Sequence, residues 1–427
     1  MMGPRRVGKT VLIHHVIQQL IRDGVSPLRI CYLSVDHPLY NDCDLSDLLD
    51  RFLDATGTVV DESPTYVFFD EVQYLKDWEV HLKALVDSHP HIKFVASGSA
   101  AAALKLKSTE SGAGRFTDFL VPPLTFYEYL LLLDKNAQMS IRNKSWFESN
   151  DISALNESFV HYLNFGGYPE VIFSPAIQSD LSRFIKSDII DKVLLRDLPS
   201  LYGIHDIQEL NSLFTALAFN TANEVSLEQL SQHSGVAKNT IKRYLEYLEA
   251  AFLIKSVHRV DRMGKKFQRA NFFKVYLTNP SIRSALFAPL LEDDQAMGDL
   301  VETGAYSQWF HTQVEESIRY ARWDGGEVDV VSIDPADRKA RWATEVKWSD
   351  RYVGQPGQLT SLIAFCKANK IARALVTSKT QFAERTVDGV QLEFVPASVY
   401  CYTVGYNIIK SKGKAAGLMR LTPESRA

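Results

Sequence analysis

An eight-residue stretch near the start of the chain has the composition of a phosphate-binding loop. It reads Gly3, Pro4, Arg5, Arg6, Val7, Gly8, Lys9 and Thr10. These residues fill every fixed position of the pattern G-x-x-x-x-G-K-[ST]. In this pattern backbone amides cradle phosphate oxygens, Lys9 reaches the terminal phosphates, and the Thr10 hydroxyl ligates Mg²⁺. The spacing therefore predicts a site for a nucleoside triphosphate and Mg²⁺ on residues 3–10.

Two acids that could complete this site follow an apolar run. Residues Thr65–Asp70 are almost continuously apolar, as expected of a parallel strand covered on both faces. The run ends in Asp70, which we expect to hold Mg²⁺, and is followed by Glu71, which we expect to polarise the attacking water. The alternative is that both acids only cap the helix expected over residues 78–86. The loop upstream favours the nucleotide site.

Further candidates lie after the next two expected strands. Lys93–Ala96 is followed by Ser97 and Ser99, which would lie at the carboxyl edge of the sheet, where ligands bind. Arg115 precedes a strand expected over 118–121 and could stabilise the transferred phosphoryl group, in its own chain or in a neighbouring subunit. A solvent-facing arginine is an equal alternative for Arg115.

The elements that position these residues form a parallel sheet with helices. The loop leads into a helix expected over 11–22, and residues 29–35 are a second apolar strand. Only Met1 and Met2 precede the loop, whereas such a loop normally follows a buried strand. We therefore expect a first domain, residues 1–135, that lacks its first strand.

Length and composition limit the remaining classes. The chain has 427 residues, of which 46% are hydrophobic and 23% charged, so we expect two to four domains. Its net charge of −4 requires any nucleic-acid contact to come from a local basic patch. Four separated cysteines argue against a structural zinc site and against a disulfide framework. With no membrane-length apolar run and no signal peptide ahead of the loop, we expect a cytoplasmic protein.

The motifs together resemble those of a known family. G-P-R-R-V-G-K-T, F-F-D-E-V-Q, A-S-G-S-A and P-P-L-T-F-Y-E-Y are similar to prokaryotic AAA-type ATPases whose C-terminal half is a domain of unknown function, number 4143. The resemblance extends through the rest of the chain. It implies that Ser97 or Ser99 senses the γ-phosphate of ATP and that Arg115 is a functional arginine.

The middle of the chain predicts a helical connector, residues 136–215, and then a winged helix-turn-helix, residues 216–278. Its wing would be formed by strands expected over 254–260 and 272–277, with basic residues between them: Arg262, Lys265, Lys266 and Arg269. Residues 134–160 are polar and interrupted, which is typical of a linker. Between 225 and 275 there are ten Lys or Arg residues against four Asp or Glu, a plausible footprint for DNA phosphates. The predicted contacts come from the start of the second helix: Lys238, Asn239, Lys242 and Arg243. The alternative is that this region only packs domains together.

The last third, residues 279–427, predicts a restriction-endonuclease-like α/β domain. Asp329 lies in one expected strand, and Glu345 and Lys347 lie two residues apart on the next, so they share a face. Asp329 and Glu345 would bind Mg²⁺, and Lys347 would steady the attacking water. The resemblance covers this D…E-x-K signature and matches Glu302 to its common helix acid. The alternative is a scaffold that has lost catalysis.

The sequence thus predicts an α/β chain: an AAA-like P-loop NTPase domain, a helical and winged-helix region, and a nuclease-like domain. The leading hypothesis is a cytoplasmic, Mg²⁺-dependent ATPase, a hydrolase whose nucleotide cycle regulates a DNA-contacting C-terminal half. The alternatives are a nucleotide-independent DNA-binding module and a metal-dependent nuclease, each with a vestigial ATPase domain. We expect no membrane partner, and we leave open whether the chain forms a homo-oligomer.

Overall fold

The computed structural model describes residues 1–40, 43–61, 63–75, 77–98, 116–204, 206–265, 271–310, 312 and 317–415. The chain forms two units. The first comprises Met1–Pro123, Ile189–Ile207 and Glu246–Leu253, and the second comprises Leu124–Asp188, Gln208–Leu245 and Ile254–Ala427. This division differs from the domains expected above, because the predicted connector and the predicted winged helix each contribute to both units.

The first unit contains a parallel sheet of three strands in the order β1-β2-β3. The strands are β1 (Ile30–Ser34), β2 (Thr65–Asp70) and β3 (Ile92–Ala96). The helices that follow the loop and the first two strands are α1 (Lys9–Arg22), α2 (Leu45–Thr56) and α3 (Trp78–Ser88). Val67 and Phe69 point from β2 into a core with Leu48 of α2 and Leu82 of α3. Since side chains alternate along a strand, Phe68 faces the opposite side of the sheet.

Met1 and Met2 pair with the chain on both sides, although they form no regular strand. Met2 makes parallel bridges to Gly98 and to Leu120, and its carbonyl oxygen accepts a hydrogen bond from the Val121 amide at 2.7 Å. A Cβ atom at Gly3 would lie 2.1 Å from the Val121 carbonyl oxygen, so only glycine fits there. The backbone contacts of Met2 and the close approach of Gly3 to Val121 therefore fix the position at which the loop begins. Of the strand expected over 118–121, the structure shows the bridge at Leu120.

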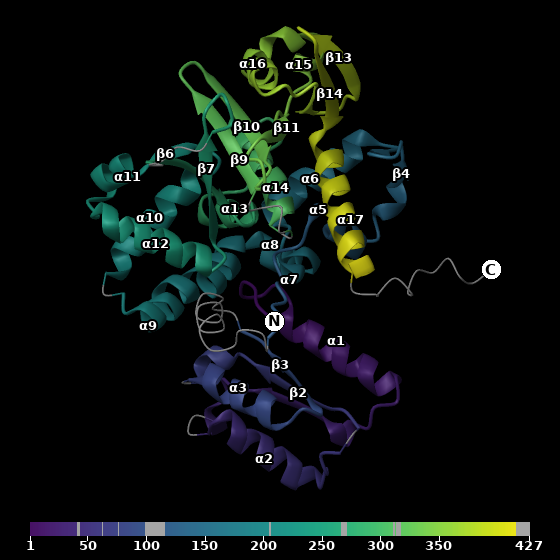
Figure 1. The fold of residues 1–427 in the computed structure, drawn as a ribbon, viewed down its shortest axis with the longest axis vertical. Helices are drawn as coiled ribbons and strands as arrows, with labels where there is room; N and C mark the ends of the chain where they lie inside the picture. Colours follow the sequence, from purple (N-terminus) through teal and green to yellow (C-terminus); the bar gives the residue numbers. More distant parts are fainter. Residues whose placement is uncertain are drawn as a thin grey trace, which may run out of the picture. The chain divides into compact units, whose positions relative to one another are not determined.

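The second unit is built on one mixed sheet of nine strands, in the order β13-β14-β12-β11-β10-β9-β7-β8-β6 (Figure 1). The strands are β6 (Glu224–Ser226), β7 (Ile254–Val260), β8 (Phe272–Leu277), β9 (Ile318–Trp323), β10 (Gly326–Ile333), β11 (Ala340–Glu345), β12 (Arg373–Ser378), β13 (Ala383–Val387) and β14 (Val390–Pro396). The hairpin β7–β8 was predicted as the wing of a separate domain, yet β7 pairs in parallel with β9. The predicted wing and the predicted nuclease core therefore share one sheet.

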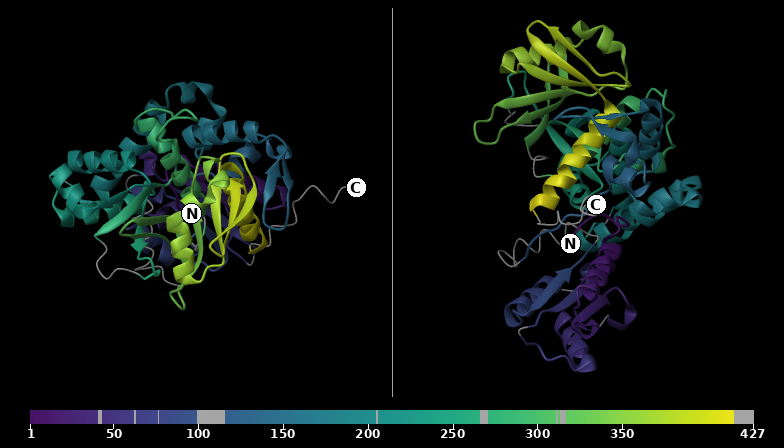
Figure 2. Two further views of the ribbon diagram at one scale, coloured as in Figure 1. Left: turned by 90° about the horizontal axis from the view of Figure 1, so that it is seen from above. Right: turned by 90° about the vertical axis from the view of Figure 1, so that its right-hand side faces the viewer.

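The helices of this unit include two that pack in its main core. α14 (Met297–Trp309) is buried along most of its length, and α17 (Ala397–Ala415) continues directly from β14 as a long helix (Figure 2). The others are α5 (Phe126–Leu132), α6 (Ile152–Phe165), α7 (Pro169–Phe173), α8 (Pro175–Ser179), α13 (Ser281–Leu286), α15 (Arg351–Gly354) and α16 (Thr360–Asn369). Helices that contribute to both units, or to the first unit alone, are η5 (Ser182–Asp191), η6 (Val193–Asp197), α9 (Leu198–Tyr202), α10 (Ile207–Phe219) and α12 (Lys238–Ala250). α11 (Leu227–Ser234) precedes α12.

The polar segment predicted as a linker, residues 134–160, is instead ordered structure. It contains the hairpin β4 (Met139–Ile141) and β5 (Phe147–Ser149) and the start of α6. The ring of Phe147 lies 5.1 Å from that of Tyr402 and 4.7 Å from that of Tyr406, between ring centroids. The linker prediction was wrong because the polar residues form turns while the aromatic residues between them pack on α17.

The turn after α6 gives a test of the second unit's packing. Gly167 has a φ of +97°, and a Cβ there would lie 2.0 Å from Nδ2 of the buried Asn279. We expect Gly167→Ala to lower the free energy of unfolding by about 2–3 kcal/mol, because backbone strain and a steric clash add. The control is Gly325→Ala, where φ is +75° but the added Cβ meets open space. Thermal unfolding of both variants measures the difference, and equal losses would contradict the role of the clash.

Candidate functional site

The predicted phosphate loop folds as a concave turn that ends at α1. Arg6 and Gly8 have φ values of 63° and 96°, and backbone amides around left-handed residues of this kind form anion-binding concavities. α1 begins at Lys9, and its N-terminal amides have no partners within the helix. The amides and the positive end of the helix dipole can therefore act together on a phosphate group.

Lys9 lies inside this loop. Its side chain is buried, and Nζ donates hydrogen bonds to the carbonyl oxygens of Gly3 at 3.0 Å and Pro4 at 2.7 Å. Burial lowers the pKa of Lys9 to about 8, although Glu71 and Asp70 act to raise it. If a phosphate group bound here, Lys9 Nζ would exchange these two carbonyl partners for charged phosphate oxygens.

Asp70 is the point at which the predicted site residues meet. Thr10 Oγ1 donates to Asp70 Oδ2 at 2.7 Å, the Tyr32 hydroxyl donates to the same oxygen at 3.0 Å, and Ser97 Oγ donates to Oδ1. The three donors come from α1, from β1 and from the end of β3. Asp70 itself is 1% exposed. The structure therefore brings Thr10, Asp70 and Ser97 together at the carboxyl edge of the sheet.

Tyr32 was missed by sequence reasoning. It lies on β1, and burial, followed by the nearby charge of Asp70, raises its pKa to about 12. The hydroxyl thus stays protonated and can donate to Asp70. A tyrosine within a predicted central strand was the only signal, and it did not reveal the contact.

Glu71 follows Asp70 in a strained backbone conformation. Its φ is 60°, in the left-handed region that non-glycine residues rarely adopt, at a cost of about 1–2 kcal/mol. Gln73 Nε2 donates a hydrogen bond to the Glu71 carboxylate. Ser99 and Arg115, the other predicted catalytic residues, lie outside the described residues.

Arg5, at a variable position of the loop, is held by a residue far away in the sequence. Its Nε and Nη2 donate to the two carboxylate oxygens of Asp197 at 2.9 and 3.0 Å, and Nη2 also donates to the Tyr74 hydroxyl at 2.8 Å. Burial alone would lower the pKa of Arg5, but the Asp197 carboxylate raises it above its ordinary value. Asp197 ends η6. This bidentate pair connects the loop to η6.

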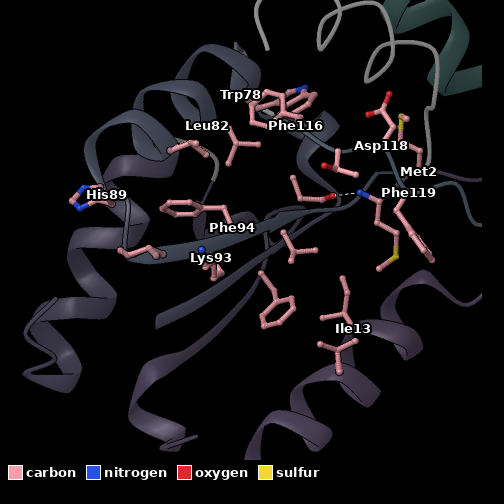
Figure 3. Close-up of a pocket in the computed structure, with 18 of the residues that line it drawn as sticks. Met2, Ile13, Trp78, Leu82, His89, Lys93, Phe94, Phe116, Asp118 and Phe119 are labelled. Atoms are coloured by element: carbon pink, nitrogen blue, oxygen red, sulfur yellow. Dashed lines mark hydrogen bonds between the residues drawn. The ribbon is translucent and has the colours of Figure 1, made fainter. Parts of the chain in front are cut away.

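A large cavity of the first unit lies apart from this site. It has a volume of about 790 Å³ and lies beside β3, between residues 92–96 and 116–119 (Figure 3). Ile13 of α1 and Trp78 and Leu82 of α3 contribute apolar walls. None of residues 3–10, 70, 71 or 97 lines it. Its mainly apolar lining does not favour phosphate, so the cavity does not coincide with the predicted site residues.

In the second unit the four residues of the predicted nuclease site lie together. Lys347 Nζ lies 2.7 Å from Glu345 Oε1 and 3.4 Å from Asp329 Oδ2. The Val346 amide also donates to Asp329 Oδ2 at 2.9 Å. Glu302 reaches the same group from α14 through Lys274, whose Nζ lies 2.9 Å from Glu302 Oε1 and 3.8 Å from Asp329 Oδ1.

One premise of that prediction was wrong. β11 ends at Glu345, so Lys347 lies beyond the strand and does not share its face by regular alternation. The Thr377 side chain holds this part of the chain instead, because Oγ1 accepts from the Lys347 amide at 2.6 Å and donates to the Lys347 carbonyl oxygen at 2.8 Å. The role of the cluster in cleavage stays a prediction.

Burial and the two lysines shift the titration of these acids in opposite directions. Burial raises the pKa of Glu345 to about 8 and that of Glu302 to about 7. Burial also acts to raise the pKa of Asp329, but Lys347 and Lys274 lower it below its ordinary value. Asp329 is therefore the carboxylate that keeps its charge most firmly. Among the described residues, no group of three or more His, Cys, Asp or Glu side chains has the arrangement of a metal site.

The residues predicted to contact DNA lie at the start of α12. Lys238, Asn239, Lys242 and Arg243 are all exposed, and Lys238 forms an ion pair with Glu228 of α11. Of the basic wing residues, 266 and 269 lie outside the described residues. In the part of the chain that the structure describes, no helix has the length and apolar character needed to cross a bilayer.

Comparison with known families bears on the first unit. Residues 1–130 match the model of an AAA domain. This match agrees with the P-loop fold and with nucleotide binding. Residues 156–294 match a domain of unknown function, number 8612, so the domain number 4143 inferred from resemblance was wrong.

The relatives are similar over most of their length but carry no described activity. An uncharacterized protein of Methanocaldococcus jannaschii is 26% identical over 351 residues, which cover 78% of this chain and 72% of the relative. An uncharacterized protein of Haemophilus influenzae is 26% identical over 290 residues, covering 66% of this chain and 67% of the relative. A second uncharacterized protein of M. jannaschii is 25% identical over 285 residues, covering 64% and 59%.

The Arg5–Asp197 pair predicts how firmly the loop is held. We expect Asp197→Ala to raise the rate of amide hydrogen exchange in residues 3–8 by about tenfold, because a partly buried, charge-assisted pair contributes about 1.5–3 kcal/mol. Hydrogen-exchange mass spectrometry measures this rate. Asp191→Ala, in the same segment of the first unit, is the control. An unchanged rate in the Asp197 variant would show that the loop does not depend on the pair.

Proposed function

We propose that the first unit binds ATP with Mg²⁺ on residues 3–10 and hydrolyses it. The convergence of Thr10, Tyr32 and Ser97 on the Asp70 carboxylate carries this proposal. These residues come from three different elements and meet at the carboxyl edge of a parallel sheet, which is where such folds bind their ligands. The AAA domain match over residues 1–130 supports the same conclusion.

The residues present fit Mg²⁺. The Thr10 hydroxyl and the Asp70 carboxylate are adjacent oxygen donors, and Mg²⁺ in nucleotide sites is held by one or two such groups together with phosphate oxygens. When bound, the ion supplies positive charge that stabilises the charge developing on the transferred phosphoryl group. Three donors to Asp70 among the described residues, Thr10, Tyr32 and Ser97, are neutral hydroxyl groups.

The chain's own residues have separate roles in this proposal. The loop amides and Lys9 bind and orient the phosphates. Glu71 lies next to Asp70 and accepts a hydrogen bond from Gln73, and it would take up the proton of the attacking water. Ser97 is fully buried and donates a hydrogen bond to Asp70, so it fixes the position of the carboxylate. Of the two serines predicted to sense the γ-phosphate, Ser97 is the one that lies within the described residues.

Two substitutions separate binding from hydrolysis. We expect Glu71→Gln to bind ATP with little change but to hydrolyse it at least about 100-fold more slowly, because a general base contributes about 10²–10⁴-fold. Lys9→Ala should lose ATP affinity as well. A phosphate-release assay and equilibrium binding of a fluorescent ATP analogue measure the two steps. Asp50→Asn on α2 and Arg22→Ala at the end of α1 are exposed controls. Normal hydrolysis by Glu71→Gln would refute the catalytic assignment.

As a second candidate function, we propose that the exposed start of α12 contacts DNA and that the nucleotide cycle regulates this contact. Four polar or basic side chains are exposed there, and Lys242 and Arg243 carry positive charge that no described ion pair neutralises. The observation supports contact with phosphates and does not identify a base sequence. A nucleotide-independent DNA-binding module is the alternative, in which ATP leaves the DNA affinity unchanged.

The charge of this surface is directly testable. We expect Lys242→Glu with Arg243→Glu to weaken binding to duplex DNA and to reduce the salt dependence of the binding constant, since each lost phosphate contact removes about one unit from its slope. Fluorescence anisotropy at several salt concentrations, with and without ATP, measures both quantities. Lys339→Glu reverses charge at an exposed site of the same unit and is the control. An unchanged slope would rule out contact through α12.

A further inference from the structure

The carboxylate cluster of the second unit contains a cation of its own. Lys274, on β8, has a side chain that is only 3% exposed, and its Nζ lies 2.7 Å from Glu327 Oε1 and 2.9 Å from Glu302 Oε1. Asp329 Oδ1 lies 3.8 Å away. Its ammonium group thus faces three carboxylates, which come from α14 and from β10. Sequence reasoning did not include this lysine in the site.

The surroundings of Lys274 hold it in this position. The Tyr276 hydroxyl donates to Glu302 Oε1 at 2.7 Å, and Nζ lies 5.5 Å from the centre of the Tyr320 ring. The Tyr276 and Tyr306 rings stack with their centroids 3.8 Å apart. Aromatic walls of this kind keep water out, so the ammonium group depends on the carboxylates for its hydrogen bonds.

The predicted nuclease chemistry needs a divalent cation at these same carboxylates. Mg²⁺ takes six oxygen ligands at close to octahedral geometry. Here each of the four carboxylates already has an oxygen paired with an ammonium group, those of Glu302, Glu327 and Asp329 with Lys274, and those of Asp329 and Glu345 with Lys347. One buried oxygen, Glu345 Oε2, has no hydrogen-bond partner. An ion that entered the cluster would therefore have to displace at least one of these ammonium groups.

We propose that Lys274 occupies the place of a divalent cation, so that the cluster formed by Glu302, Glu327, Asp329 and Glu345 is closed to Mg²⁺ in the native chain. The two lysines balance much of the carboxylate charge without a metal, and Lys274 joins β8 to α14 and β10. Replacement of Lys274 by an uncharged residue opens the site between Glu302, Glu327 and Asp329. The native cluster serves as a structural network and does not support metal-dependent cleavage.

The test is a titration of the nucleotide-free full-length chain with Mn²⁺, followed by electron paramagnetic resonance of the free ion. All variants carry Asp70→Asn, which removes the carboxylate of the first unit's candidate metal site. With Lys274 intact, we expect no Mn²⁺ site below the millimolar range. Lys274→Met should gain one Mn²⁺ site whose dissociation constant is at least about tenfold below the millimolar range. Adding Asp329→Asn to it should abolish that site.

Further variants separate the opened site from other causes. Lys339→Met, which removes an exposed lysine of the same unit, should gain no site. If Lys274→Met fails to fold, Lys274→Gln is the second variant that opens the site. Glutamine is uncharged like methionine but keeps a polar end group. Mn²⁺ should also raise the melting temperature of the opened variant and leave that of the intact chain unchanged.

Two results overturn the proposal. One is a Mn²⁺ site in the chain with Lys274 intact that Asp329→Asn abolishes, since the cluster would then hold a metal beside its lysine. The other is a folded Lys274 variant that binds no Mn²⁺, since the place of the ammonium group would then not be a cation site. The first result can be obtained without any Lys274 variant.

Discussion

A buried carboxylate must be matched by donors or by cations, and this constraint organises both units of the chain. Asp70 in the first unit is matched by the hydroxyls of Thr10, Tyr32 and Ser97. These groups donate hydrogen bonds to its oxygens and carry no charge of their own. The cluster around Asp329 in the second unit is matched by ammonium groups, which neutralise charge as well as satisfy oxygens. Hydroxyl donors add no charge beside Asp70, whereas two ammonium groups lie 3.8 and 3.4 Å from the oxygens of Asp329.

The same constraint explains which elements are held together. Asp70 requires donors from α1, β1 and the end of β3, so it fixes the helix of the phosphate loop to two strands of the sheet. Lys274 requires acceptors from α14 and β10, so it fixes the hairpin β7–β8 to the rest of the nine-stranded sheet. Arg5 acts similarly on the loop, because its pair with Asp197 binds the chain start to η6. In each case a polar side chain that cannot remain unpaired decides a long-range contact.

The parts of the fold that sequence predicted well depend on neighbours in the chain. The strands β7 and β8 begin and end as predicted, and the helix after the loop, β2 and the acids at its end follow from local patterns of apolar residues. The parts that it missed depend on residues far apart. Asp197 lies 192 positions from Arg5, and nothing in the sequence around either residue indicates that the two form a pair. The hairpin predicted as a wing joins a larger sheet because β7 pairs with β9, and no local pattern specifies that partner.

The D…E-x-K spacing shows the limit of a short motif most clearly. Its acids and Lys347 do lie together, although β11 ends too early for the alternation that predicted it and Thr377 supports the chain instead. Such a spacing indicates which side chains lie together, but it does not indicate how their charge is balanced. That balance depends on Lys274, which comes from another hairpin and sits 2.9 Å from Glu302. An active metal site and a closed structural network can therefore share the same motif, and the cation supplied by a distant strand distinguishes them.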